Sequence, residues 1–299
     1  IGIREAVPGS LREWNVSYQE VDFSPEGNID RAKIKEKLEN KRIKTVLIQR
    51  SKGYGWRKSL TVSEIGDTIS FIKSLRPDVF ILVDNCYGEF TEEREPSSVH
   101  ADLTVGSLIK NPGGGLAPTG AYAVGTKRAI GLLSQRLTSP GIGKEEGSFP
   151  YGYILFYQGL FLAPHTVAEA LKGSVLAGRI FHQLGYRVLP EWEDHRSDII
   201  QSIEFRSARE LIAFCQAIQS ASPVDGHVVP YPWDMPGYPH QVIMAAGTFV
   251  QGASIELSAD APIREPFIAY LQGGLTYAHV KLAMMKVLTR MYGEGFIQL

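Results

Sequence analysis

The sequence predicts an α/β protein in which a mostly parallel sheet with helices on both faces is followed by a smaller C-terminal α+β domain. The runs Thr45–Gln49 and Val79–Asp84 are apolar without alternation, as expected of strands covered on both faces. A helical pattern lies between them, and such a strand–helix–strand crossover makes the two strands parallel. After Gly185 the pattern changes to short strands and helices. We therefore divide the chain into residues 1–163 and 164–299.

The elements of the first domain follow from local signals. Asp30 can cap a helix over residues 31–38, and Thr61 with Glu64 forms a capping box for a second helix that stops at Pro77. The further elements expected here are strands at 103–105 and 122–125 and a helix over 127–137. The turn-rich stretch 138–147 is expected to be a loop near the site.

The second domain begins with a long helix that we expect to start after Pro164 and to end at Gly185. Beyond it, strands are predicted at 187–189, 199–204, 242–246 and 253–257, and helices over 207–220 and 276–291. The proline-rich stretch 230–239 is predicted to be a rigid loop.

Composition limits the function classes. A formal net charge of −1 and a pI near 6.7 give no long-range attraction for nucleic acid or anionic lipid, so the expected partner is a small molecule. Two cysteines form no disulfide framework or C-x-x-C zinc pair, and we predict no metal site. The apolar stretches are shorter than the roughly 20 residues that cross a bilayer, and the opening residues do not resemble a targeting segment. We expect a cytoplasmic protein that is a fragment or a processed chain.

Lys110 is the first candidate for chemistry. It follows the apolar Leu108 and Ile109, and a partly desolvated amine is nucleophilic enough to form a Schiff base with pyridoxal phosphate. The alternative is a solvated surface lysine. The glycines at 113–115 allow positive φ and close backbone approach, which suits either a tight hairpin or a ligand. A nucleotide-binding P-loop is disfavoured, because its lysine follows the glycines.

Asp84 is the second candidate. It ends a predicted strand 26 positions before Lys110, where ligands of parallel sheets bind. An ionised carboxylate there would keep the pyridine nitrogen of the cofactor protonated, so that the ring withdraws electrons from the substrate. The alternative is an aspartate that only caps the following turn. Ser107 could donate a hydrogen bond to the cofactor phosphate.

Three motifs resemble one known family: DNCYGEF at 84–90, GSLIKNPGGG at 106–115 and SADAPIREP at 258–266. Together they are similar to the methionine gamma-lyase-like proteins also known as aluminium resistance proteins, a branch of the fold type I pyridoxal phosphate enzymes. The resemblance covers the whole chain. Such enzymes have an earlier segment with a phosphate-binding loop and a stacking aromatic residue, which has no counterpart before Ile1.

The resemblance implies roles for individual residues. Lys110 would bind the cofactor covalently, Asp84 would pair with its pyridine nitrogen, and Ser107 would contact its phosphate. Two groups of further candidates follow: Gln49 and Ser51 for the cofactor, and Arg264, Arg50 and Tyr87 for the substrate. Arg264 could hold a carboxylate in bidentate fashion, or could instead form a salt bridge with Asp260 or Glu265.

The implied activity is carbon–sulfur lyase chemistry, a beta or gamma elimination from a sulfur-containing amino acid through a Lys110 Schiff base. Two alternatives remain open: a replacement transferase of the cystathionine synthase type, and a truncated homologue without catalytic activity. Related enzymes complete their sites across subunits, so we expect a homodimer or homotetramer.

Overall fold

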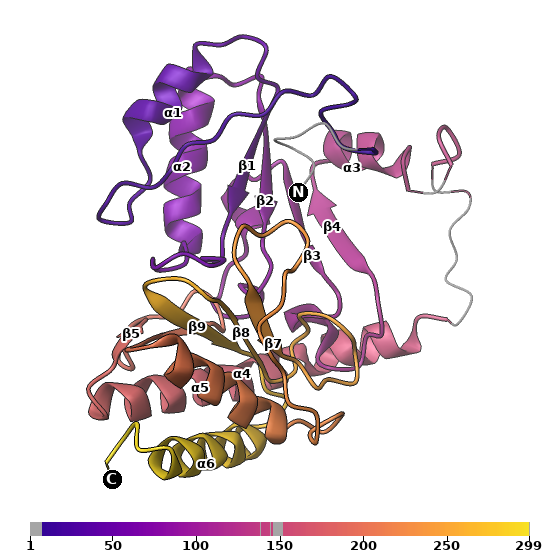
Figure 1. The fold of residues 1–299 in the computed structure, drawn as a ribbon. Coiled ribbons are helices and arrows are strands. Elements are labelled where there is room, and N and C mark those ends of the chain that lie inside the picture. The colour runs from indigo at the N-terminus through magenta and orange to yellow at the C-terminus, as the bar shows by residue number, and fades with distance from the viewer. Residues whose placement is uncertain (1–7, 138, 144, 146–151, 299) are drawn as a thin grey trace.

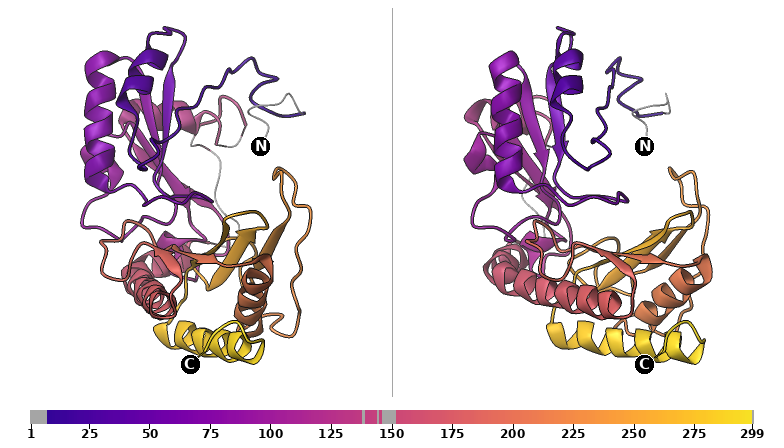
Figure 2. Two further views of the ribbon diagram at one scale, coloured as in Figure 1. Left: turned by 60° about the vertical axis from the view of Figure 1, so that its left-hand side comes forward. Right: turned by 90° about the vertical axis from the view of Figure 1, so that its left-hand side faces the viewer.

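The computed structural model describes residues 8–137, 139–143, 145 and 152–298. They form two α/β units, the first with a four-stranded sheet and the second with a five-stranded sheet (Figures 1 and 2). Among the described residues no helix is long and apolar enough to span a membrane. Of the expected loop at 138–147, residues 139–143 and 145 are described and form turns and bends, as predicted, whereas residues 138, 144, 146 and 147 lie outside the described part of the chain.

The first sheet has the order β1-β2-β3-β4. Its strands are β1 (Thr45–Gln49), β2 (Phe80–Asp84), β3 (Leu103–Ser107) and β4 (Ala121–Gly125). The first three are parallel, as predicted, and β4 is antiparallel to β3. The orientation of β4 was not anticipated. The connection from β3 contains only the short 3-10 helix η2 (Asn111–Gly113) and no α-helix that could return the chain across the sheet, as a further parallel strand usually requires.

Helices α1 (Arg31–Leu38) and α2 (Val62–Leu75) pack on one face of this sheet (Figure 1). Their predicted caps are confirmed: Asp30 accepts a hydrogen bond from Lys33 N at 3.0 Å, and Thr61 and Glu64 form the capping box. The shared core contains Ile65, Ile69, Ile72, Ile81 and Val83. On the opposite face Leu47 is 57% exposed. Two further elements belong to the first unit: the 3-10 helix η1 (Pro96–Val99) between β2 and β3, and α3 (Lys127–Ser134) after β4.

The long helix α4 (Ile154–Gln183) starts well before the predicted position, and Pro164 lies inside it. The prediction that Pro164 precedes the helix is therefore wrong. A proline inside a helix removes one backbone hydrogen bond. Packing of the preceding turns against η2 offsets that cost, because Gly159 brings the helix backbone against Gly113.

The second sheet is antiparallel, with the order β5-β6-β9-β8-β7. Its strands are β5 (Arg187–Leu189), β6 (Gln201–Phe205), β7 (Val242–Ala245), β8 (Ser258–Pro262) and β9 (Phe267–Gln272). The strand predicted at 253–257 is wrong and β9 was missed. Ile255 and Leu257 are buried in a loop, and the small residues of β8 give a weak strand signal.

Helices α4 and α5 (Ala208–Ser220) pack on one face of the second sheet, and α6 (Tyr277–Gly293) packs against these two helices (Figures 1 and 2). Ser207 and Thr276 cap α5 and α6, close to the predicted starts. The core between helices and sheet contains Phe181, Phe205 and Phe214 with their rings 5.1–5.5 Å apart. The other face of the sheet meets the first unit through Ile200, Ile268 and Tyr270.

Candidate active site

The carboxyl ends of the three parallel strands bring the first candidates to one edge of the sheet. Gln49 is the register partner of Asp84, which is in turn the partner of Val105 on β3. Ser107 ends β3 two residues later. The parallel register therefore places Gln49, Asp84 and Ser107 near one another, as the strand pattern predicted.

Asp84 opens a tight turn. Its Oδ1 accepts a hydrogen bond from Cys86 N at 3.1 Å, so it does cap the turn. Its carbonyl oxygen accepts from Arg50 N at 3.0 Å. Tyr87 then adopts a left-handed φ of 70°, which directs the chain back toward the loop that carries Lys110. The side chain of Asp84 remains partly exposed.

Lys110 follows β3, and its Nζ lies 5.0 Å from the centre of the Tyr87 ring. The buried Asn111 next to it holds the two loops together, because its Nδ2 donates to the carbonyls of Tyr87 at 3.0 Å and Glu89 at 2.9 Å. In the described part of the chain no carboxylate lies within 4.0 Å of the Lys110 amine. The amine lies over an aromatic face and is paired with no acid of the described residues.

Cys86 shows that Asp84 and Lys110 share one environment. Burial raises the pKa of the Cys86 thiol to about 12; the Asp84 carboxylate adds to the rise and the Lys110 ammonium opposes it. Both charges are therefore close enough to act on one sulfur atom. The thiol stays protonated near neutral pH, and a protonated thiol is a poor nucleophile.

The loop after β1 directs several of its side chains into the protein interior. The guanidinium of Arg50 is fully buried, and Ser51 Oγ donates to Asp198 Oδ2 at 3.0 Å. Lys52 Nζ donates to the carbonyls of Leu189 and Ile200, and burial lowers the pKa of Lys52 to about 8. The cofactor role of Ser51 and the substrate role of Arg50 stay predictions, and the observed contacts of both side chains are within the protein.

Arg264 is exposed and lies at the interface of the two units, where its Nη2 donates to the Tyr54 carbonyl at 3.5 Å. Within the described chain it forms neither of the predicted salt bridges, because Asp260 instead accepts from Tyr54 Oη at 2.6 Å. Arg264 is thus free to contact a ligand. No group of three or more His, Cys, Asp or Glu among the described residues could hold a metal ion.

Asp260 gives a prediction about stability. Burial raises its pKa from 3.8 to about 6, so folding favours the protonated acid. That contribution is fully present below about pH 3.8 and is lost as the pH rises through about 6. From pH 4 to 7 the free energy of unfolding of the wild type should fall by on the order of 2 kcal/mol relative to Asp260→Asn. Urea unfolding at both pH values measures this difference, and parallel profiles would contradict it.

Sequence reasoning missed several residues that shape the site, among them Cys86, Asn111, Gly159 and Asp198. Cys86 and Asn111 lie inside the quoted motifs, so their position gave a signal that residue type alone did not. Gly159 and Asp198 come from α4 and from the segment before β6. Only the fold brings Gly159 to the loop after β3 and Asp198 to the loop after β1, and no local sequence pattern indicates either residue.

Comparisons with known proteins agree with this arrangement. The chain matches the methionine gamma-lyase family over residues 1–292. It is 54% identical over 276 residues to the Bacillus subtilis protein YnbB, covering 92% of this chain and 65% of that protein. It therefore spans about two thirds of the length of that relative.

Two solved structures are similar to this chain. One is a Listeria monocytogenes protein described as a candidate cystathionine beta-lyase involved in aluminium resistance: 48% identity, TM-score 0.92, covering 97% of this chain and 71% of that chain. The other is a carbon–sulfur lyase involved in aluminium resistance from Clostridium novyi: 50% identity, TM-score 0.89, with 95% and 66% covered.

A more distant likeness shows the fold alone. A serine palmitoyltransferase that carries pyridoxal phosphate as an internal aldimine has a TM-score of 0.55 at 13% identity. The predicted fold class and the resemblance stated from the three motifs are confirmed. The chain belongs to the methionine gamma-lyase family.

Proposed function

We propose that the protein is a pyridoxal phosphate-dependent carbon–sulfur lyase that eliminates a thiol from a sulfur-containing amino acid. The observation that carries the proposal is that Asp84 and Lys110 lie in one environment: both charges act on the Cys86 thiol, and the Lys110 Nζ lies 5.0 Å from the centre of the ring of Tyr87 in the same turn. The family match and the carbon–sulfur lyase from Clostridium novyi support it.

The residues fit the cofactor chemically. Lys110 offers an amine without a carboxylate partner among the described residues, and Asp84 offers a partly exposed carboxylate at the strand edge. Cys86, a second nucleophile in the same environment, is kept as a thiol by its raised pKa. The Lys110 amine suits the aldehyde of the cofactor, and the Asp84 carboxylate suits its ring nitrogen. The Ser107 hydroxyl suits its phosphate.

When bound, pyridoxal phosphate supplies a ring that stabilises negative charge at the alpha carbon of an amino acid. In the proposed reaction Asp84 keeps the ring nitrogen protonated and Ser107, with Gln49 nearby, helps to hold the cofactor. Lys110 holds the cofactor covalently and then, as a free amine, takes the alpha proton. Tyr87 orients the Lys110 amine through its ring face. Arg264 is the candidate for the substrate carboxylate.

We also propose that the protein works as a homodimer or homotetramer. The first turns of α4, which pack on the Lys110 loop, expose Ile154, Tyr157 and Phe161 by 78%, 72% and 83%. An apolar surface of this kind, next to a site, is typical of an interface.

The test uses pyridoxal phosphate with the wild-type chain. A visible absorption band should form and disappear on borohydride reduction, and mass spectrometry should place the added mass on Lys110. Lys52 is the internal control, because its lowered pKa makes it the other lysine suited to react with an aldehyde, although it is only 4% exposed. Label on Lys52 instead of Lys110, or no reducible band, would refute the proposal.

A further inference from the structure

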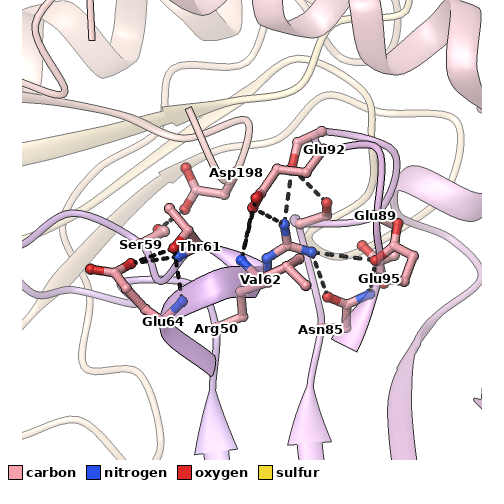
Figure 3. Close-up of polar contacts among 12 residues, drawn as sticks. Arg50, Ser59, Thr61, Val62, Glu64, Asn85, Glu89, Glu92, Glu95 and Asp198 are labelled. Carbon is pink, nitrogen blue, oxygen red and sulfur yellow. Dashed lines mark hydrogen bonds and ion pairs between the residues drawn. The ribbon is translucent and has the colours of Figure 1, made fainter. Parts of the chain in front are cut away.

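Arg50 is the most completely enclosed charge near the site. Its side chain is 0% exposed, and its Nη1 donates to Asn85 Oδ1 at 2.8 Å and lies 3.3 Å from Glu95 Oε2 (Figure 3). Its Nη2 lies 2.6 Å from Glu92 Oε1 and 3.4 Å from Thr91 Oγ1. All four partners belong to one segment, residues 85–95, which follows Asp84.

The backbone of Arg50 is fixed in the same place. Its N–H donates to the carbonyl of Asp84 at 3.0 Å, and its carbonyl accepts from Leu60 N at 3.0 Å. The segment folds around the side chain so closely that a Cβ on Gly88 would lie 2.5 Å from Arg50 Cδ. Arg50 therefore contacts both Asp84 and the segment that follows it, and its side chain fills the space inside the turn.

The partners of Arg50 also form hydrogen bonds with neighbouring elements. Glu92 also accepts from Val62 N, at the start of α2, at 3.2 Å (Figure 3). Asn85 Nδ2 donates to Glu95 Oε2 at 2.9 Å and to Tyr122 Oη, on β4, at 3.1 Å. The turn after β2 is thus anchored to α2 and β4 through groups that Arg50 holds. A buried ion pair of this kind adds little net stability, but losing one partner is costly and the arrangement is specific.

We propose that Arg50 is a positioning residue: it fixes the turn that presents Asp84, Cys86 and Tyr87 to Lys110, and it does not contact the substrate. This inference rests on the proposed function for its catalytic meaning, although the ordering of the turn is a property of the protein without cofactor. Full burial excludes direct contact, and every partner of the guanidinium that we describe lies in the turn itself.

The chain offers a matched control in Arg76. Its side chain is also buried in the first unit, where it pairs with Asp78 at 2.8 Å and donates to the carbonyls of Leu38 and Ile43. It lies before β2, at the end of the sheet opposite Asp84. Arg76→Lys and Arg50→Lys both weaken a buried arginine network, but only Arg50→Lys should disturb the turn.

Cys86 serves as the probe in the protein without cofactor. In a Cys215→Ala background it is the only thiol, because the chain has two cysteines. Arg50→Lys should raise the rate at which Ellman's reagent modifies Cys86 by at least about tenfold, because a weakened buried charged hydrogen bond favours local opening. Arg76→Lys should change that rate less than about twofold. Glu92→Gln, which keeps the shape of the side chain, should give an intermediate increase.

A second readout uses the bound cofactor. With pyridoxal phosphate, Arg50→Lys should weaken binding by about tenfold or more and move the pH midpoint of the visible band, whereas Arg76→Lys should leave that midpoint at the wild-type value. If Arg50→Lys does not fold, Glu92→Gln decides in its place. Equal labelling rates and equal midpoints in the Arg50 or Glu92 variant and in the Arg76 variant would overturn the inference. Absence of the visible absorption band in the wild type would contradict the proposed function. The rates of Cys86 labelling would still decide whether Arg50 orders the turn.

Discussion

Lys110→Arg should lower the rate of thiol release from a sulfur-containing amino acid by at least about 10²–10⁴-fold, the usual contribution of a positioned general base. Arginine keeps the positive charge over the Tyr87 ring, which Lys110 Nζ now occupies at 5.0 Å. A guanidinium does not lose its proton in proteins, however, so it can neither hold the cofactor covalently nor accept the alpha proton. Release of thiol, ammonia and oxo acid from L-cystathionine or L-methionine, with added pyridoxal phosphate, measures the effect.

The control is Lys58→Arg, a change of the same kind at a lysine whose side chain is 60% exposed and pairs with Asp194. It should retain the wild-type rate. The product analysis also separates the alternatives, because a new thioether in place of ammonia and oxo acid would indicate replacement. If Lys110→Arg kept the wild-type rate, Lys110 would not be the base and the proposed mechanism would fail.

Gly159→Ala is the second large effect we expect, and it acts through α4. A Cβ on Gly159 would lie 2.2 Å from the carbonyl oxygen of Gly113, and one on Gly114 would lie 2.3 Å from the carbonyl oxygen of Gly159. Two backbones meet here, so no side chain can move aside. Separating them should reduce the free energy of unfolding by about 3 kcal/mol or more, at the upper end for overpacking, and should weaken pyridoxal phosphate binding through Lys110.

Gly131→Ala is the matched comparison, because it makes the same change inside a helix, α3, where an added Cβ meets nothing within 4 Å. It should raise the free energy of unfolding by about 0.5–1 kcal/mol, since alanine loses less backbone entropy than glycine. Urea unfolding should therefore show a lower free energy of unfolding than the wild type for Gly159→Ala and a higher one for Gly131→Ala. A neutral or stabilising Gly159→Ala would show that α4 and the Lys110 loop are not held together as described.

The sequence was most informative where a local rule decides the structure. The caps at Asp30 and Thr61, and the parallel pair that ends in Gln49 and Asp84, were predictable because each depends on a few neighbouring residues. The start of α4 was not predictable, because the stretch before Pro164 becomes helical by packing on a distant loop. Strand β8 was missed for a similar reason: its register with β9 comes from sheet pairing and not from an apolar pattern.

In the candidate site, too, some features could be predicted from neighbouring residues and others depend on distant packing. Asp84 and Lys110 could be proposed because their residue types and their positions after strands suit one kind of chemistry. The glycines at 113–115 were expected to serve a hairpin or a ligand, and the structure shows close approach to α4 at Gly113 and Gly114. The basic loop after β1 suggested ligand contacts. That suggestion stays a prediction; the structure shows contacts of these residues within the protein, with partners up to 210 positions away in the sequence, which no local pattern could indicate.

The loop after β1 also connects the first unit to the second. Arg50 grips the turn beside β2, whereas Ser51, Lys52 and Tyr54 reach Asp198, Leu189 and Asp260 in the second unit. Any movement of the second unit would therefore pull on residues 51–54, which directly follow Arg50, the residue that holds the turn at Asp84. Such a movement would reach the Asp84 carboxylate through one short stretch of chain, so the position of this charge is coupled to the placement of the second unit.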